Sequence, residues 1–191
     1  MSRAQLRTWA NFLAYEAVWF VTVYSAGRDR TLPGVLAALA FACLQLAVSE
    51  QRGADVRLIA AALAVGTLLD GTLAATGVVQ YSSTPPALPP GGAPVWILAL
   101  WAAFALTLNH SLRWLRGRPL VGALLGAVGG PLAYISSSRI SGAVTFAVPE
   151  WRAVVCLAVG WGAAIALLAY LAGEWARTLS RPHRVARELA P

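Results

Sequence analysis

The sequence predicts an all-α membrane protein, a polytopic transmembrane bundle of six helices with both termini on the cytoplasmic side. Three observations predict this class. The chain has 191 residues, of which 58% are hydrophobic and 12% are charged, whereas soluble domains carry about 25% charged residues. Six apolar segments approach the length of about 20 residues that a spanning helix needs. The arginines gather in alternate connections between these segments, which is typical of membrane topology signals.

The six segments account for most of one domain, residues 1–191. In chain order, the predicted helices are 9–26, 32–49, 56–79, 95–114, 120–135 and 151–172. The first segment follows Arg3 and Arg7 as the apolar part of a signal peptide does, but Glu16 interrupts it. We therefore interpret it as a retained helix.

The fifth segment is the weakest of the six. Gly129, Gly130 and Pro131 interrupt it, so a broken helix is predicted. The semi-polar residues 136–148 that follow are re-entrant, interfacial or part of the fifth helix, and the sequence leaves these three alternatives open. The connection 81–93 holds four prolines and no charge, so we expect it to be stiff and extended.

Arginine counts predict the orientation. Eleven of the 15 basic residues, all of them arginine, fall on the side that holds the two termini and the second and fourth connections. The other side holds only Arg28, Arg30, Arg139 and Arg152. This bias places both termini in the cytoplasm. The net charge of +7 does not predict a nucleic-acid partner, because the arginines do not form one basic face.

Small residues predict close helix contacts. Gly122, Gly126 and Gly130 follow one another at four-residue spacing, which lets two helix backbones approach closely. The contact lies inside the bundle or in a homo-oligomer. Gly66 and Asp70 share a similar face of the third segment, which would bury Asp70.

Polar residues inside the apolar segments are the candidate functional groups, because charge within a membrane is costly and usually marks function. Glu16 and Asp70 are the candidate catalytic residues, with structural pairing as the alternative for each. Further residues that could contact a ligand are Asn11, Trp19, Trp101, Asn109, His110, Tyr134 and Arg139.

Helix rise separates these candidates in depth. At 1.5 Å per residue, Glu16 lies about 10 Å and His110 about 5 Å from the cytoplasmic boundary, whereas Asp70 lies about 20 Å from it. A single site with all three is therefore not expected. We expect Glu16 to pair with Asn109, His110 or Arg113. Asp70 is expected to pair with Tyr134, residues 136–138 or Arg139.

No cofactor or metal is predicted. The sequence has no P-loop, no GxGxxG after a strand, no GxSxG and no HExxH motif. With only two histidines, a cluster of several histidine ligands is excluded.

Two segments carry a family resemblance: Leu-Asn-His-Ser-Leu-Arg-Trp-Leu at 108–115 and Gly-Gly-Pro-Leu-Ala-Tyr at 129–134. With them, nearly the whole chain resembles an uncharacterised bacterial inner-membrane family, domain of unknown function 2878. The resemblance implies a multi-pass protein of the bacterial inner (plasma) membrane without a settled activity. The resemblance also implies a role connected with lipid, because genes of this family often lie beside fatty-acid-modifying genes.

Three functions are compatible with these residues. The first is binding of a membrane lipid or another apolar small molecule within the bundle, in a binding or accessory role. The second is an enzyme that uses a buried carboxyl as a general acid on a lipid or isoprenoid-like substrate. The third is a small transporter. A cavity that opens sideways to lipid favours the first two, and a wet path through both halves favours the third.

Overall fold

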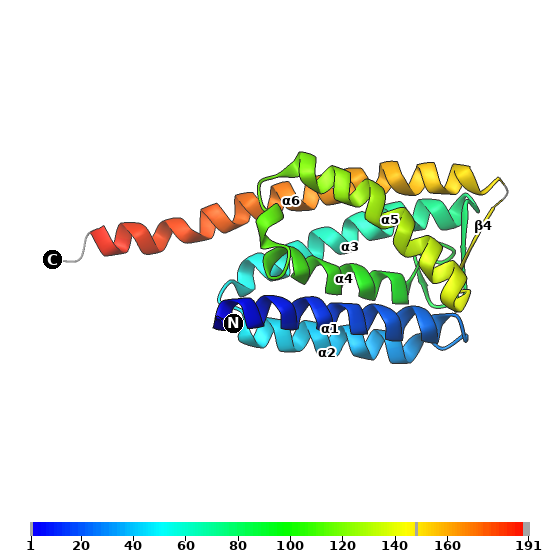
Figure 1. The fold of residues 1–191 in the computed structure, drawn as a ribbon, viewed down its shortest axis with the longest axis horizontal. Helices are drawn as coiled ribbons and strands as arrows, with labels where there is room; N and C mark the ends of the chain where they lie inside the picture. The colour runs from blue at the N-terminus through cyan, green and yellow to red at the C-terminus, as the bar shows by residue number, and fades with distance from the viewer. Residues whose placement is uncertain (1, 148, 189–191) are drawn as a thin grey trace.

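Six α-helices form the fold, and successive helices run in opposite directions (Figure 1). The structure is a computed structural model that describes residues 2–147 and 149–188, with side chains up to residue 178. The helices are α1 (Arg3–Ala26), α2 (Thr31–Val48), α3 (Arg52–Ala75), α4 (Val95–Asn109), α5 (Pro119–Ser141) and α6 (Glu150–Glu188). The expected all-α, six-helix architecture is confirmed for this part of the chain.

The outer surface of the bundle is suited to a membrane. Helices α2, α3, α5 and α6 are long and apolar enough to cross one. The first of the two remaining helices, α1, has 24 residues, and α4 is apolar but has only 15. Exposed large apolar side chains occur on every helix except α4, and a soluble protein rarely exposes so much apolar surface. The chain is thus a membrane protein.

Helix α4 lies at the centre of the bundle (Figure 1). It packs against α1, α2, α3 and α6, and Trp96, Trp101 and Leu106 are at most 1% exposed. A helix that is apolar on all sides must be covered by others, which explains why the shortest of the six helices occupies this place.

The glycines of α5 pack against α6 of the same chain. A Cβ atom on Gly126 would lie 2.2 Å from the carbonyl oxygen of Trp161, and one on Gly130 would lie 2.4 Å from its Cγ. Gly122 meets the backbone of Ile165 in the same way. Of the two uses expected for this ladder, the structure has the contact inside the bundle. A homo-oligomer stays a prediction.

The expected break in the fifth helix is not present. Helix α5 continues through Pro131 and ends at Ser141, so residues 136–141 form its last turns. An internal proline removes one helical hydrogen bond, and neighbouring helices in a membrane bundle tolerate this loss. Residue 142 is a glycine with φ of 68°, which ends the helix in the left-handed conformation that glycine adopts readily.

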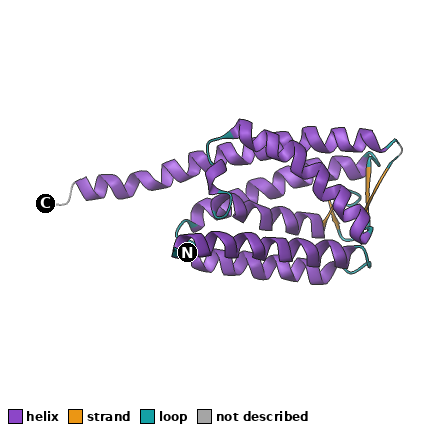
Figure 2. Cartoon of the chain, viewed as in Figure 1, coloured by secondary structure: helices purple, strands orange, loops and turns teal. Residues whose placement is uncertain are grey.

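Two small antiparallel sheets cover the end of the bundle opposite the start of α1 (Figure 2). Strand β1 (Val79–Tyr81) pairs with β4 (Val144–Phe146), with Tyr81 opposite Val144. Strand β2 (Ala87–Leu88) pairs with β3 (Ala93–Pro94). The connection 81–93 is therefore not simply extended, because it folds back on itself. We call this end the sheet end, and the end where α1 begins the N-terminal end.

Candidate functional site

A cavity of about 560 Å³ lies between α1, α4, α5 and α6. Its wall is mainly apolar and includes nine of the 18 aromatic side chains of the protein. The aromatic lining residues are Tyr15, Trp19, Phe20, Trp96, Trp101, Phe104, Trp114, Tyr134 and Trp161. A volume of this size falls within the range of about 300–1,000 Å³ that small-molecule sites occupy.

The cavity extends along most of α5, because both Leu125 and Ile140 line it. These two residues are about 22 Å apart at 1.5 Å per residue. Several lining residues are also exposed on the outer surface: Phe20 on α1, and Leu125, Leu132 and Ile140 on α5. The cavity therefore opens sideways between α1 and α5, through a mouth that is mainly apolar, with the partly exposed Glu16 one turn from Phe20.

Asp70 lies behind the wall of this cavity rather than in it. Its side chain is completely buried on α3, and three groups donate hydrogen bonds to it. The hydroxyls of Tyr81 (2.8 Å) and Tyr134 donate to Oδ1, and the indole Nε1 of Trp101 donates to Oδ2 at 2.6 Å. Trp101 and Tyr134 line the cavity and stand between it and the carboxylate.

The Asp70 carboxylate joins four elements, because its donors come from β1, α4 and α5. Tyr81 reaches it since β1 directly follows α3 and is held by β4. Burial raises the pKa of the Tyr81 hydroxyl well above its ordinary value, so this group remains a donor at neutral pH. A buried carboxylate that accepts three internal hydrogen bonds contributes chiefly to the stability of the fold.

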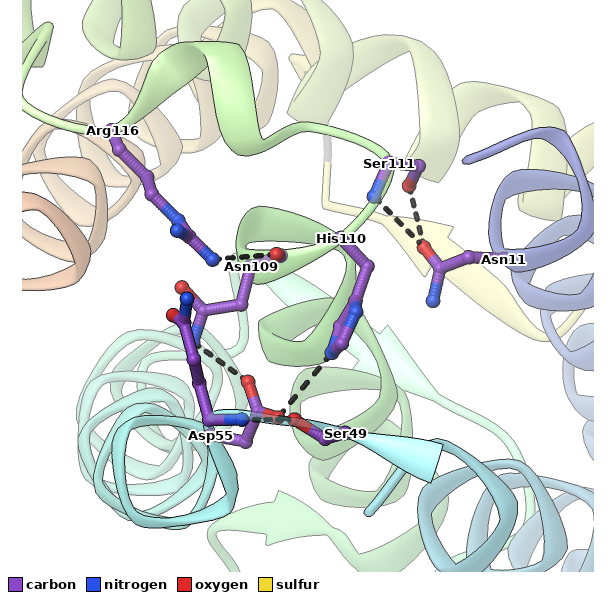
Figure 3. Close-up of polar contacts among 8 residues, drawn as sticks. Asn11, Ser49, Asp55, Asn109, His110, Ser111 and Arg116 are labelled. Carbon is purple, nitrogen blue, oxygen red and sulfur yellow. Dashed lines mark hydrogen bonds and ion pairs between the residues drawn. The ribbon is translucent and has the colours of Figure 1, made fainter. Parts of the chain in front are cut away.

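A second polar group surrounds Asp55 near the N-terminal end (Figure 3). The Asp55 side chain is completely buried. Ser49 donates to Oδ2 at 2.5 Å, and the amide of Asn109 donates to Oδ1 at 2.8 Å. Nε2 of His110 lies 3.3 Å from Oδ2. Ser49, Asp55 and the end of α4 are thus joined in one network.

Side chains also satisfy the backbone where α4 ends. Helix α4 stops at Asn109 rather than at the expected residue 114. Nη2 of Arg116 donates to the Asn109 carbonyl at 2.6 Å, and Oδ1 of Asn11 accepts from the backbone N and Oγ of Ser111. Burial lowers the pKa of Arg116, and the Asp55 charge opposes this shift. Irregular backbone inside a bundle requires such partners.

Glu16 differs from both aspartates, because it lines the cavity. Among the described residues it has no hydrogen-bond or ion-pair partner. Its expected pairing with Asn109, His110 or Arg113 is wrong, since Asn109 and His110 bind Asp55 and no hydrogen bond or ion pair joins Glu16 to Arg113 in the described part of the chain. Glu16 and Trp19 of helix α1 both line the cavity, and Asn11 and Val18 of the same helix are buried.

The structure thus places the predicted site residues in different parts of the bundle. Glu16, Trp19, Trp101 and Tyr134 line the cavity, and the expected contact of Asp70 with Tyr134 is confirmed. Asn109 and His110 belong to the Asp55 network, and Asn11 binds the neighbouring Ser111. Arg139 is exposed and is not among the donors to Asp70.

Sequence reasoning missed Asp55 and Tyr81. Asp55 stands next to Arg52 and Arg57 and is easily taken for a charge at the membrane boundary. The available signal is its place in the first turn of α3, where an acidic residue favours a helix start. Within the described part of the chain, no group of three or more metal-ligating side chains occurs.

A family comparison covers both polar groups and the cavity. The model of the family described as Protein of unknown function (DUF2878) matches residues 8–167. This chain belongs to that family. In this DUF2878 protein, segment 108–115 supplies Asn109, His110 and Ser111, and segment 129–134 supplies Tyr134. No curated protein and no solved structure matches the chain.

Proposed function

We propose that this DUF2878 protein binds a lipid or another apolar small molecule in the cavity between α1, α4, α5 and α6. The observation that carries the proposal is the apolar, largely aromatic wall of a 560 Å³ cavity that opens through a mainly apolar mouth. A molecule that enters the cavity would exchange its contacts with membrane lipids for contacts with aromatic and aliphatic side chains. Trp96, Ile97 and Leu100 of α4, all of them buried, form part of its wall.

The length of the cavity supports a chain-like ligand. Lining residues span about 22 Å along α5, which exceeds the ~15 Å of one leaflet of a bilayer core about 30 Å thick. The mouth between α1 and α5 faces the surface that carries Phe20 and Leu132. A lipid chain can enter from the membrane without crossing water.

The proposal includes the placement of the protein in the membrane. All six helices cross it, with α4 inside the bundle, and the arginine bias puts the N-terminal end in the cytoplasm. The membrane is the bacterial inner membrane. Arg113 and Arg116 then lie near the cytoplasmic lipid headgroups, and the two small sheets lie on the other side.

A cavity-filling substitution tests the proposal. Gly129 lines the cavity, and a Cβ atom there meets no atom within 4 Å. Gly129→Phe should fold, because the helix gains a side chain without a clash, and it should exclude ligand. The measurement is the lipid that remains bound to protein purified in nanodiscs, identified by mass spectrometry. We expect a loss of at least about tenfold, which corresponds to ~1.4 kcal/mol.

Gly53→Phe is the matched control, because Gly53 is also an exposed helical glycine with open space around it, but it lies outside the cavity. It should retain the wild-type amount of bound lipid. Equal lipid content in Gly129→Phe, Gly53→Phe and wild type would count against the proposal.

An enzyme is the second candidate function, and the position of Glu16 favours it. A carboxyl in the wall of the cavity lies where it can donate a proton to a bound substrate, as a general acid does. Asp70 is less suited to this role, because Trp101 and Tyr134 separate it from the cavity and its oxygens already accept three hydrogen bonds. The apolar wall does not favour a path for polar solutes, as a transporter would need.

Membrane-lipid profiles test the enzyme. A strain without the gene is compared with strains that carry the wild type, Glu16→Gln or Glu50→Gln, where Glu50 is an exposed carboxylate outside the cavity. An enzyme predicts a lipid species that changes in the deletion and in Glu16→Gln but returns with Glu50→Gln. Identical profiles in all four strains would remove the enzyme and leave the binding proposal intact.

A further inference from the structure

Half of the aromatic side chains of this protein line one cavity, together with a single charged residue. The nine aromatic residues are accompanied by Glu16, and no arginine, lysine or histidine is among the described lining residues. Two kinds of group in this wall favour a positive charge. Aromatic faces carry partial negative charge, and the one ionisable carboxyl adds a full negative charge when it is deprotonated.

Five of the nine aromatic residues form a connected cluster across four helices. The rings of Trp101 and Trp161 are stacked, with centroids 4.3 Å apart. Phe104 meets both of them edge-on, and it also meets Tyr15 at 5.8 Å. Tyr134 meets Trp161 at 6.2 Å. Because each ring is fixed by its neighbours, the cluster is ordered before any ligand enters.

We propose that the ligand of this cavity is a lipophilic cation, a tertiary or quaternary ammonium group on an apolar chain. The inference rests on the proposed function, because it names the class of molecule that the cavity would bind. A cation over an aromatic face gains on the order of 2- to 30-fold in affinity when the usual interaction energy is converted. The Glu16 carboxylate adds to this gain.

The cation would bind next to Glu16. Glu16 and Trp19 are three residues apart on α1 and both line the cavity, so they lie one turn apart on the same face. An ammonium group beside Glu16 therefore also reaches the Trp19 ring. An opposite charge nearby favours the ionised carboxylate, and the ligand supplies the partner that Glu16 otherwise lacks.

Neutral and anionic ligands fit the wall less well. A neutral hydrocarbon leaves the Glu16 carboxyl without a partner in an apolar setting, which is unfavourable. An anion meets Glu16 and finds no basic side chain in the lining to offset it. The aromatic rings repel an anion at their faces for the same reason that they attract a cation.

A pair of probes of equal shape tests the inference. Wild-type protein in nanodiscs of uncharged digalactosyldiacylglycerol, which carries no ammonium group, is titrated with dodecyltrimethylammonium and with its neutral analogue, in which carbon replaces the nitrogen. Tryptophan fluorescence reports binding, because five of the eight tryptophans line the cavity. We expect saturable binding of both probes, with a Kd for the cation at least about tenfold lower.

Two variants test whether Glu16 and Trp19 cause the preference for the cation. Glu16→Gln removes the charge, and Trp19→Leu removes one aromatic face while keeping the carboxyl, so one variant remains informative if the other folds poorly. Each should reduce the preference for the cation by about 3- to 10-fold. Glu50→Gln, which changes an exposed carboxylate outside the cavity, should leave the preference unchanged.

The outcomes separate the inference from the proposed function. Equal Kd values for the two probes overturn the inference that the ligand is a cation, but they remain compatible with a neutral apolar ligand. A preference that survives in both Glu16→Gln and Trp19→Leu also overturns the inference, because the cation then binds elsewhere. If neither probe binds saturably to the wild type, the proposed function fails together with the inference.

Discussion

The two sides of α4 differ in how completely they are filled. On the side of α2 and α3, each oxygen of the two buried carboxylates has a donor: Asp70 accepts from Tyr81, Trp101 and Tyr134, and Asp55 accepts from Ser49 and Asn109. On the side of α1 and α5 there is a cavity, and Glu16 in its wall has no partner among the described residues.

This difference separates carboxylates with internal hydrogen-bond partners from a carboxyl without one. A carboxylate that accepts several internal hydrogen bonds stabilises the fold at the point where elements meet. A carboxyl without a partner stabilises nothing, so its presence in a membrane helix calls for another explanation. Before the fold is known, Glu16 and Asp70 look alike, since both are single acids in apolar segments.

Asp70→Ala should give the largest loss of stability. Removing the carboxylate leaves the buried donors of Tyr81, Trp101 and Tyr134 without an acceptor, and such orphaned groups cost about 1–3 kcal/mol each. We expect a total loss of at least ~3 kcal/mol, measured by SDS-induced unfolding in mixed micelles. Asp70→Asn keeps one carbonyl acceptor and should lose less. Wild-type stability for Asp70→Ala would break the comparison.

Asp55→Ala should rank second. Its donors Ser49 and Asn109 are buried, but His110 is partly exposed, with 25% of its side chain accessible, so water can replace one partner. We expect a loss of about 2 kcal/mol in the same unfolding assay. A loss larger than that of Asp70→Ala would reverse the order of the two networks.

Gly126→Ala and Gly129→Ala sharpen the comparison on a single helix. The new methyl group of Gly126→Ala meets the backbone of α6, which should destabilise the protein by about 1–3 kcal/mol. At Gly129 the methyl group meets open space, and the change should stabilise the helix by ~0.5–1 kcal/mol. Opposite signs in one thermal unfolding experiment are expected, and losses of equal size would mean that the cavity side is packed.

Glu16→Gln should have the smallest effect on stability, within about 0.5 kcal/mol of wild type, because no internal hydrogen bond or ion pair is lost. Unfolding in mixed micelles measures this as well. A loss comparable to that of Asp55→Ala would show that Glu16 has a structural partner and would remove the contrast between the two sides.

The sequence predicted the elements better than their contacts. Length and hydropathy gave the six helices, and depth along the helices correctly separated Asp70 from His110. The Asp55 network was not predictable, because Asn109 lies 54 residues away from Asp55 and α4 was expected to continue past it. The helix end at Asn109 depends on Arg116 and Asn11, which only the folded chain brings there.

The α5–α6 contact shows the opposite case. Its glycine spacing was readable in the sequence, since close backbone approach requires small residues wherever it occurs. The partner was not readable, because a second copy of the chain would use the same ladder. Pro131 was misleading for a related reason: its effect on a helix depends on the neighbours that support it, and α5 continues through it.

Because the mouth lies between α1 and α5, the occupancy of the cavity would depend on the concentration of the ligand in the membrane. A molecule that enters through a mainly apolar opening arrives from the hydrocarbon phase, so its occupancy follows its mole fraction among the membrane lipids rather than its concentration in water. A component that makes up a few lipids in a hundred would fill such a cavity even if each contact were weak. Selectivity then rests on the wall of the cavity, and high affinity in the usual aqueous sense is not required.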